Sequence, residues 1–403
     1  MPPKTPTGFD PDRLNDLRRP KDLVPRILRR EMQPPPDENS GVTDIRVIGV
    51  GGAGNNAINR MMKSGLDGVE FIAINTDAQD LDSSNAHRNI LIGEKCTNRL
   101  GSGGDPQLGE RAATESTDAL ARAVEGADMV FVTAGMGGGT GTGATPVIAD
   151  LALAAGALTV GVATVPFSFE GSRRTEIAKQ GLETFEPRVD TLITVHNDKL
   201  LKHADARTAF TDAFAIADEM LHRGVQGVAD LITTTGLINV DFADVRSVMQ
   251  NSGTAMMGVG QAHGEERAMR AVGEAMDSPL LNTSIDDASG VLLNITASAD
   301  VSMAEVNEAA KYIAEVVAPD ANIIFGTVVD PEMDQAIRVT LIATGFRAPD
   351  PSIRARQLRR KPRQHSSQGF APESDLDLDV HAAGNEIENL EFLRIRQQPE
   401  AHI

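Results

Sequence analysis

The sequence predicts an α/β fold in which a largely parallel sheet, covered by helices on both faces, is followed by a smaller α+β domain. Between residues 45 and 200, short apolar runs typical of buried strands alternate with longer helix-like stretches. Three glycine clusters fall at the carboxyl ends of predicted strands, where ligands bind in such folds. Beyond residue 233 the pattern of strands and helices changes and indicates a mixed sheet.

Composition narrows the class of protein. The 403 residues allow two or three domains with sizeable cores. The formal net charge of −19 would repel phosphate backbones, so we expect no nucleic-acid partner. The single cysteine, Cys96, cannot form an internal disulfide and fits a reducing compartment. No apolar run approaches the ~18 residues that span a bilayer, and no signal peptide opens the chain. We therefore expect a cytoplasmic protein without direct membrane insertion.

The first glycine cluster follows a predicted strand over residues 45–50 and precedes a helix that we expect to begin at Asn55. Residues 49–54 match GxGxxG, which alone is a weak indication of a dinucleotide site. The next predicted strand, 69–77, ends in Asp77, at a suitable distance for binding a ribose hydroxyl. These residues leave an NAD-dependent enzyme open as an alternative.

The second glycine cluster, residues 100–104, leads into an amphipathic stretch that predicts one long helix over residues 106–126. Asp105 is a suitable N-cap for this helix, and Pro106 is favoured at its first position. Capping does not explain the glycines that come before it. The cluster therefore remains a candidate binding loop.

The third glycine cluster, GMGGGTGTG at residues 135–143, is the most informative stretch. It lies between an apolar run at 129–134, which predicts a buried strand, and a helix-like run at 144–155. Its glycines expose backbone N–H groups, and the following helix adds its positive N-terminal end, so the loop suits a chain of phosphates. It contains no lysine, and GxxxxGK[ST] occurs nowhere in the chain, so it is not a P-loop.

Two further strands are predicted at residues 158–165 and 191–195, and they end in the loops PFSFEGSRR and HNDKLL. A long apolar helix follows from about residue 208 to 232 and joins this half of the chain to the next. Because the carboxyl ends of parallel strands meet at one edge of the sheet, we expect all these loops to converge on one crevice.

The stretch GLINVDFADV at residues 236–245 has two interpretations. Asn239 or Asp241 can cap the helix that follows, with Asp244 in its first turn. On the residues alone, capping is favoured over chemistry.

The remainder predicts a small α+β domain and two disordered ends. Four strands and two helices are expected, the strands at 255–259, 291–296, 322–327 and 337–342 and the helices at 265–276 and 303–317. Residues 1–43 lack a periodic apolar face and predict a disordered arm. Residues 347–386 predict a charged, disordered linker, and residues 387–403 a short apolar and basic peptide that binds a partner.

Six motifs occur in one order along the chain: GVGGAGNN, INTDAQ, ADMVFVTAGMGGGTGTGA, FSFEG, NDKLL and GLINVDFADV. On these motifs, residues 44–346 resemble the bacterial FtsZ cell-division proteins of the tubulin/FtsZ GTPase family. The resemblance implies a Rossmann-like GTP-binding domain over 44–207, a central helix over 208–233 and a C-terminal α+β domain over 234–346 that carries the catalytic loop.

The resemblance also implies that GTP and GDP bind with Mg²⁺ between the phosphates, and it implies no metal ligands from the protein. Asp218 would recognise guanine, because a carboxylate accepts two hydrogen bonds from the N1–H and N2–H₂ edge that adenine lacks. Phe214 would stack on the base. The full set of implied nucleotide contacts is Gly51, Gly52, Ala53, Gly54, Asn55, Asp77, Gly103, Gly104, Gly137, Gly138, Gly139, Thr140, Gly141, Thr142, Glu170, Arg174, Asn197, Phe214 and Asp218.

For the catalytic loop, the resemblance implies a role between subunits. Asn239, Asp241 and Asp244 would cap the nucleotide of the next subunit in a head-to-tail filament, where the two acids position and polarise the attacking water. Hydrolysis would then be coupled to polymerisation into the contractile ring at midcell. Residues 388–397, which include Phe392, Leu393 and Arg394, would bind membrane-tethering and regulatory division proteins.

Two alternatives remain open at the level of the sequence. A nicotinamide-dependent oxidoreductase would use the GxGxxG glycines, but it lacks an evident acid or base for hydride chemistry and leaves the other two glycine clusters without a role. A tubulin-like protein that binds GTP for shape control or plasmid segregation would share the pocket and differ in its partners.

Overall fold

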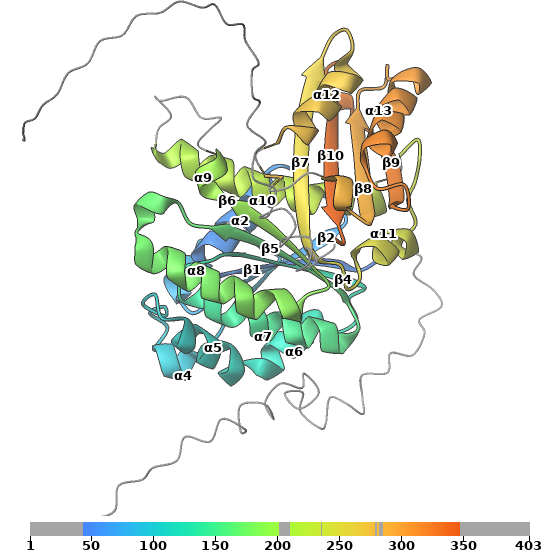
Figure 1. The fold of residues 1–403 in the computed structure, drawn as a ribbon. Coiled ribbons are helices and arrows are strands. Elements are labelled where there is room, and N and C mark those ends of the chain that lie inside the picture. Colours follow the sequence, from blue (N-terminus) through green and yellow to red (C-terminus); the bar gives the residue numbers. More distant parts are fainter. Residues whose placement is uncertain (1–42, 201–209, 235, 279, 282–284, 347–403) are drawn as a thin grey trace, which may run out of the picture. The chain divides into compact units, whose positions relative to one another are not determined.

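The computed structural model describes residues 43–200, 210–234, 236–278, 280–281 and 285–346. Within these residues the strands form one ten-stranded sheet in the order β3-β2-β1-β4-β5-β6-β7-β10-β8-β9 (Figure 1). Residues 1–42 of the predicted N-terminal arm, the whole predicted linker at 347–386 and the partner-binding peptide at 387–403 lie outside the described residues. Among the described residues, no helix has the length and apolar character needed to cross a membrane.

The first six strands of the sheet are all parallel, as the sequence predicts. β3 was not predicted, because its four residues are half-buried or exposed and form no long apolar run. In chain order the strands are β1 (Ile45–Val50), β2 (Val69–Asn75), β3 (Arg88–Leu91), β4 (Met129–Gly135), β5 (Leu158–Val165) and β6 (Thr191–His196).

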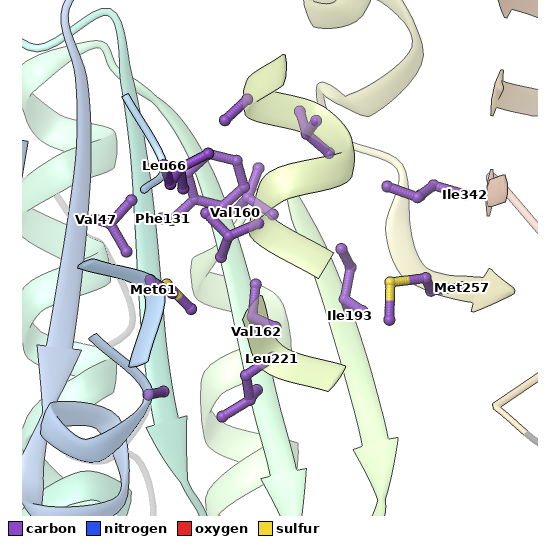
Figure 2. Packing of buried hydrophobic residues seen from close by; sticks show 14 of the residues in the cluster. Val47, Met61, Leu66, Phe131, Val160, Val162, Ile193, Leu221, Met257 and Ile342 are labelled. Atoms are coloured by element: carbon purple, nitrogen blue, oxygen red, sulfur yellow. The ribbon is translucent and has the colours of Figure 1, made fainter. Parts of the chain in front are cut away.

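Helices cover both faces of this parallel sheet (Figure 1). One face packs against α2 (Gly51–Lys63) and α10 (Phe210–Thr233), and the cluster includes Val47, Phe131 and Val160 (Figure 2). The other face packs against α5 (Pro106–Glu115), α6 (Thr117–Val124), α7 (Thr140–Ala155) and α8 (Ser172–Phe185). Three short helices lie in the connections, α3 (Ala78–Asp82), α4 (Glu94–Thr97) and α9 (Asn197–Leu200).

Two helices begin earlier than predicted, so parts of the glycine clusters are helical. α2 begins at Gly51 and not at Asn55, and α7 begins at Thr140 and not at residue 144. The low helix propensity of glycine, about 1 kcal/mol below alanine, argued against these starts. Close packing explains the glycines in both helix starts, since a Cβ would lie 2.6 Å from the carbonyl oxygen of Thr133 at Gly54, and 2.8 Å from that of Gly135 at Gly141.

The single helix predicted over residues 106–126 is wrong, because α5 ends at Glu115 and α6 begins at Thr117. Between them, Ser116 has a non-helical ψ of 19°, and its hydroxyl accepts a hydrogen bond from the backbone N–H of Gly93 at 3.0 Å. Because this partner lies 23 residues away, the local pattern did not reveal the break.

The second half of the chain adds a mixed sheet to the first. β10 (Ala336–Thr344) is antiparallel to β7 (Gly253–His263) and β8 (Gly290–Ala297), whereas β8 and β9 (Asn322–Val329) are parallel. β7 also pairs with β6 over three residue pairs, so the sheet is continuous. The helices of this half are α11 (Phe242–Met249), α12 (Arg267–Met276) and α13 (Met303–Val316).

The long helix α10 packs on strands of both halves. Leu221 of α10 belongs to the same buried cluster as Ile193 of β6, Met257 of β7 and Ile342 of β10 (Figure 2). The backbone approach is close, since a Cβ added at Gly227 would lie 2.5 Å from the side chain of Thr340. One apolar core therefore joins the two halves along this helix.

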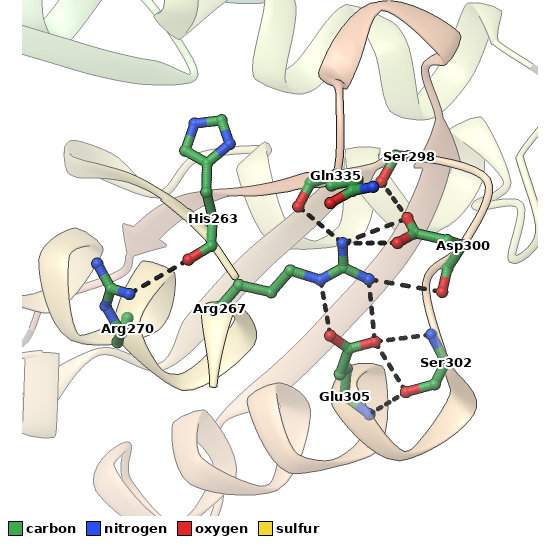
Figure 3. Close-up of polar contacts among 8 residues, drawn as sticks. All are labelled: His263, Arg267, Arg270, Ser298, Asp300, Ser302, Glu305 and Gln335. Carbon is green, nitrogen blue, oxygen red and sulfur yellow. Dashed lines mark hydrogen bonds and ion pairs between the residues drawn. The ribbon is translucent and has the colours of Figure 1, made fainter. Parts of the chain in front are cut away.

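A buried arginine ties together three segments of the second half (Figure 3). Arg267, 6% exposed, donates to both carboxylate oxygens of Asp300, to Glu305 at 2.7 Å and to the carbonyl oxygen of Gln335. Glu305 also belongs to the capping box of α13 with Ser302. We call these residues and Ser298 the Arg267 cluster.

Candidate functional site

A cavity of about 610 Å³ lies at the carboxyl ends of β1, β2, β4 and β5. All three glycine clusters contribute to its wall. Its volume is in the range of sites for small ligands and cofactors. The predicted residues that line it are Gly51, Gly52, Ala53, Asp77, Gly104, Gly138, Gly139, Thr140, Gly141, Glu170, Arg174, Asn197, Phe214 and Asp218.

One part of the cavity is formed by two helix N-termini without side-chain caps. Val50 precedes α2 and Gly139 precedes α7, and neither provides a side-chain hydrogen bond to its helix. The two helices meet closely, since a Cβ added at Gly51, whose φ is +71°, would lie 2.9 Å from the backbone nitrogen of Gly141. Free N–H groups and two helix dipoles therefore face one space, which favours a polyanion.

A chain of buried hydroxyl groups connects the loops of this wall. Thr140 lies 2.6 Å from the hydroxyl of Thr76 and 2.9 Å from the hydroxyl of Ser102. These contacts link the start of α7 to the residue that follows β2 and to the second glycine cluster. Sequence reasoning missed Ser102 and several other lining residues, which are Val50, Asn75, Asp80, Gly101, Gly135, Met136, Thr164, Pro166 and Ala217. Most of them lie at the end of a predicted strand or in a glycine cluster, which was the available signal, whereas Asp80 and Ala217 lie on the helices α3 and α10.

Five predicted contact residues do not line the cavity, namely Gly54, Asn55, Gly103, Gly137 and Thr142. Gly54 packs against β4, as described above. The hydroxyl of Thr142 accepts a hydrogen bond from the N–H of Gly137 at 2.9 Å, so this pair shapes the third glycine loop from within. Asn55 is 2% exposed, and within the described chain its side-chain oxygen and nitrogen have no hydrogen-bond partner.

One side of the cavity carries an ion pair. Arg174 of α8 donates to Glu170 at 2.6 Å, and the second carboxylate oxygen of Glu170 accepts from the backbone N–H of Phe167. Phe167 is fully buried and meets Phe214 of α10 edge-to-face, with ring centroids 5.3 Å apart. The loop after β5 thus holds a charged pair next to an aromatic ring.

A carboxylate and an amide at the α10 side of the cavity are poorly paired. Burial raises the pKa of Asp218 to about 6, and Arg60, 3.8 Å away, offsets only part of this shift. The side-chain oxygen of Asn197, which is 5% exposed, has no hydrogen-bond partner among the described residues. A half-buried carboxylate with a raised pKa and a buried, unsatisfied amide oxygen in one cavity indicate a ligand with several hydrogen-bond donors.

Two more carboxylates line the cavity after β2. Asp77 caps α3 through the backbone N–H of Gln79, at 3.0 Å, and Asp80 accepts a hydrogen bond from Asn75 at 2.5 Å. In the described part of the chain, no three His, Cys, Asp or Glu side chains are grouped to hold a metal ion. Asp77 and Asp80 fit a hard cation such as Mg²⁺ only if the phosphates supply most of its ligands.

The predicted catalytic residues lie outside this cavity. Asp241 caps α11 through the N–H of Ala243 at 3.2 Å, and Asn239 accepts from the N–H of Gly236 at 2.7 Å. Asp244 is exposed in the first turn of α11. Arg246 of the same helix donates to the carbonyl oxygen of Gly156, which precedes β5. This contact puts α11 at the amino end of β5, whereas the cavity lies at its carboxyl end.

Comparison with known proteins agrees with this geometry. Residues 44–205 match the GTPase domain of the Tubulin/FtsZ family, and residues 253–347 match the C-terminal domain of the FtsZ family. The FtsZ dimer of M. jannaschii is 42% identical with a TM-score of 0.74, and the match covers 82% of this chain and 93% of that one. A tryptophan-to-tyrosine mutant of the same FtsZ is 43% identical, with a TM-score of 0.74 and coverage of 81% and 96%.

A more distant match shows the fold alone. CetZ2 from Haloferax volcanii, in a GTPγS-bound protofilament, is 22% identical with a TM-score of 0.64, over 79% of this chain and 97% of that one. These matches do not show the bacterial source that the sequence led us to expect. They leave no support for the oxidoreductase alternative, because the glycine clusters belong to a GTPase domain. The chain is a GTPase and belongs to the tubulin/FtsZ family.

Proposed function

We propose that this GTPase polymerises head-to-tail into protofilaments and forms a contractile ring at the cytoplasmic face of the cell-division site. The bacterial setting rests on the sequence resemblance. We propose the predicted organisation with it: a GTP-binding domain over 44–207, a central helix over 208–233 and a C-terminal domain over 234–346. The membrane-tether peptide at 388–397 lies outside the described residues and stays a prediction.

One observation carries this proposal: the nucleotide cavity and the two candidate catalytic acids lie at opposite ends of the same strand. The cavity includes Thr164, near the carboxyl end of β5, whereas α11 is bonded at Gly156, before the amino end of β5. Eight residues of strand separate these ends by about 26 Å. Asp241 and Asp244 therefore have no access to a nucleotide in their own subunit, but in a head-to-tail filament they would face the nucleotide of the next.

Each part of the cavity has a task in this proposal. The N–H groups at the starts of α2 and α7 would hold the phosphates, Glu170 and Arg174 the ribose, and Asn197 and Asp218 the guanine edge. Asp241 and Asp244 from the neighbouring subunit would orient the attacking water and accept its proton. Mg²⁺, when bound, would neutralise the developing charge on the phosphates.

The substitution Asp244→Ala tests this assignment. Removing the carboxylate should lower GTP turnover by about a hundredfold or more, while the affinity of the monomer for GTP stays within about twofold, because the cavity is untouched. Asp118→Ala is a matched control, since Asp118 is also exposed in the first turn of a helix, α6. A large loss of nucleotide affinity, or turnover equal to that of the control, would limit Asp244 to a structural role in the first turn of α11.

A further inference from the structure

The contact between Arg246 and Gly156 joins α11, which carries Asp244, to α7, which begins at the cavity. The guanidinium of Arg246 donates to the carbonyl oxygen of Gly156 at 2.7 Å, across 90 residues of sequence. Gly156 is the C-cap residue of α7, with a φ of +87°. The last carbonyl groups of a helix have no intrahelical donor and carry partial negative charge, so a cation is favoured there.

Arg246 is directed to this carbonyl by its surroundings. Its guanidinium lies 5.7 Å from the ring centre of Phe242, one turn earlier on α11. Its Nε is buried and has no acceptor among the described residues. Within the described residues, the bond to Gly156 is the hydrogen bond that this guanidinium makes outside α11, and it joins α11 to the end of α7.

The helix α7 runs from the cavity to the carbonyl group that Arg246 binds, so it can connect the two sites. It has 16 residues and is about 24 Å long. Thr140 and Gly141 at its start line the nucleotide cavity, and its side chains are buried along most of its length. Since a close-packed helix moves as a unit, a shift at its N-terminal end reaches Gly156 at its C-terminal end.

The rest of α11 does not depend on Arg246 for folding. Val245 and Met249 are fully buried in the cluster below α10, and Asp241 caps the helix. These contacts keep α11 folded against the core, while the side chains of Asp241 and Asp244 stay exposed. The arginine bond ties α11 to the GTP-binding half next to this turn, while at the other end of α11 the hydroxyl of Thr191 in β6 donates to the carbonyl oxygen of Met249.

We propose that Arg246 is a positioning residue for hydrolysis: its bond to Gly156 holds Asp241 and Asp244 at the end of the helix whose other end lines the cavity. The nucleotide in one subunit would thereby set the placement of the acids that this subunit presents to its neighbour. The inference rests on the proposed function, because it takes the two acids to act across the subunit interface.

The test compares full-length Arg246→Ala and Arg246→Lys with Arg270→Ala. Arg270 is a matched control, because it also donates to one backbone carbonyl, that of His263, and lies on α12 (Figure 3). Three quantities are measured: the affinity of the monomer for GTP, the polymer formed with a slowly hydrolysed GTP analogue, and GTP turnover per polymerised subunit. The thermal unfolding midpoint is recorded for each variant.

For Arg246→Ala we expect turnover per polymerised subunit to fall by about ten- to a hundredfold, as for a small misplacement of catalytic groups. Affinity, polymer amount and unfolding midpoint should match those of Arg270→Ala. Arg246→Lys should recover part of the turnover, because its ammonium group still donates to the helix end.

Three results would overturn the proposal: turnover equal to the control, a parallel loss of affinity, polymer or midpoint, or a lysine variant no better than alanine. Asp244→Ala, measured in parallel, distinguishes failure of the proposed function from failure of the inference about Arg246. If Asp244→Ala hydrolyses GTP normally, the proposed function fails. If Asp244→Ala is inactive and Arg246→Ala is fully active, only this inference fails.

Discussion

The Arg267 cluster and the nucleotide cavity both gather carboxylates around few arginines, yet the carboxylates are paired to different degrees. Hydrogen bonds from Arg267 lower the pKa of Glu305 to about 2, while burial raises the pKa of Asp218 to about 6. Arg267 lies 2.7 Å from Glu305, whereas Arg60 stays 3.8 Å from Asp218. A cluster whose carboxylates are fully hydrogen-bonded stabilises the fold, whereas a cavity whose carboxylate is incompletely bonded favours a ligand that supplies the missing hydrogen bonds.

The neutral groups of the two regions show the same contrast. In the Arg267 cluster, Ser298 donates to Asp300 and Ser302 to Glu305, so each hydroxyl is engaged. At the cavity, the side-chain oxygen of Asn197 has no partner within the described residues, although it is buried. Unsatisfied buried groups cost free energy in the empty protein and favour the ligand that pairs with them.

The substitution Arg267→Ala gives the largest expected effect on stability. It leaves Glu305 and Asp300 without their cation and should cost about 2–3 kcal/mol of unfolding free energy, less than for a fully buried pair because both acids are partly exposed. Chemical unfolding measures this loss, with Arg270→Ala near zero as control. The folded variant should keep its affinity for GTP, and a large loss of affinity would mean that the two regions are not independent.

The substitution Asp218→Asn tests the incompletely paired carboxylate of the cavity. The amide offers one acceptor oxygen instead of two, so affinity for GTP should fall at least about tenfold, and the preference for GTP over ATP should shrink. Competition binding on the monomer measures both. Asp212→Asn, an exposed position earlier on α10, is the control. An unchanged preference for GTP would remove Asp218 from the base-recognition site.

The pH dependence of nucleotide affinity should show the smallest effect. In the empty cavity Asp218 takes up a proton as pH falls through about 6, its raised pKa. Guanine donors would stabilise the ionised form and lower this pKa in the complex, so binding would release a proton below pH 6. Affinity should therefore drop as pH falls from 7 to 5 and be level above 7.

The phosphates of GTP titrate in the same range, so the informative quantity is the difference between wild-type protein and Asp218→Asn. We expect this difference to shrink as pH falls through 6. A constant difference would show that the Asp218 carboxyl does not change protonation on binding.

Much of the fold was predictable because its strands are apolar runs and its glycines stand at strand ends. β1, β4 and β5 are buried on both sides, so their positions follow from hydrophobic pattern alone. The break at Ser116 was not predictable, because it depends on a bond to the distant Gly93. The early starts of α2 and α7 were missed for a related reason, since tertiary packing outweighs the low helix propensity of glycine.

At the site, residues that carry a motif were easier to find than residues brought there by folding. Residues 51–53 and 138–141 line the cavity as motif residues. Asp80 and Ala217 line it too, but they lie on the helices α3 and α10, and their local sequence does not mark them as site residues. Asn55 belongs to a motif and yet does not line the cavity, because α2 turns its side chain into the protein interior.

The central claim is that hydrolysis needs two subunits, and GTP turnover per subunit as a function of protein concentration tests it most directly. Turnover and light scattering would be recorded together in the presence of Mg²⁺. We predict no turnover below a threshold concentration and a rise in step with scattering above it, because Asp241 and Asp244 complete the cavity of a neighbour. Constant turnover per subunit down to dilute monomer would contradict the account and indicate a self-contained site.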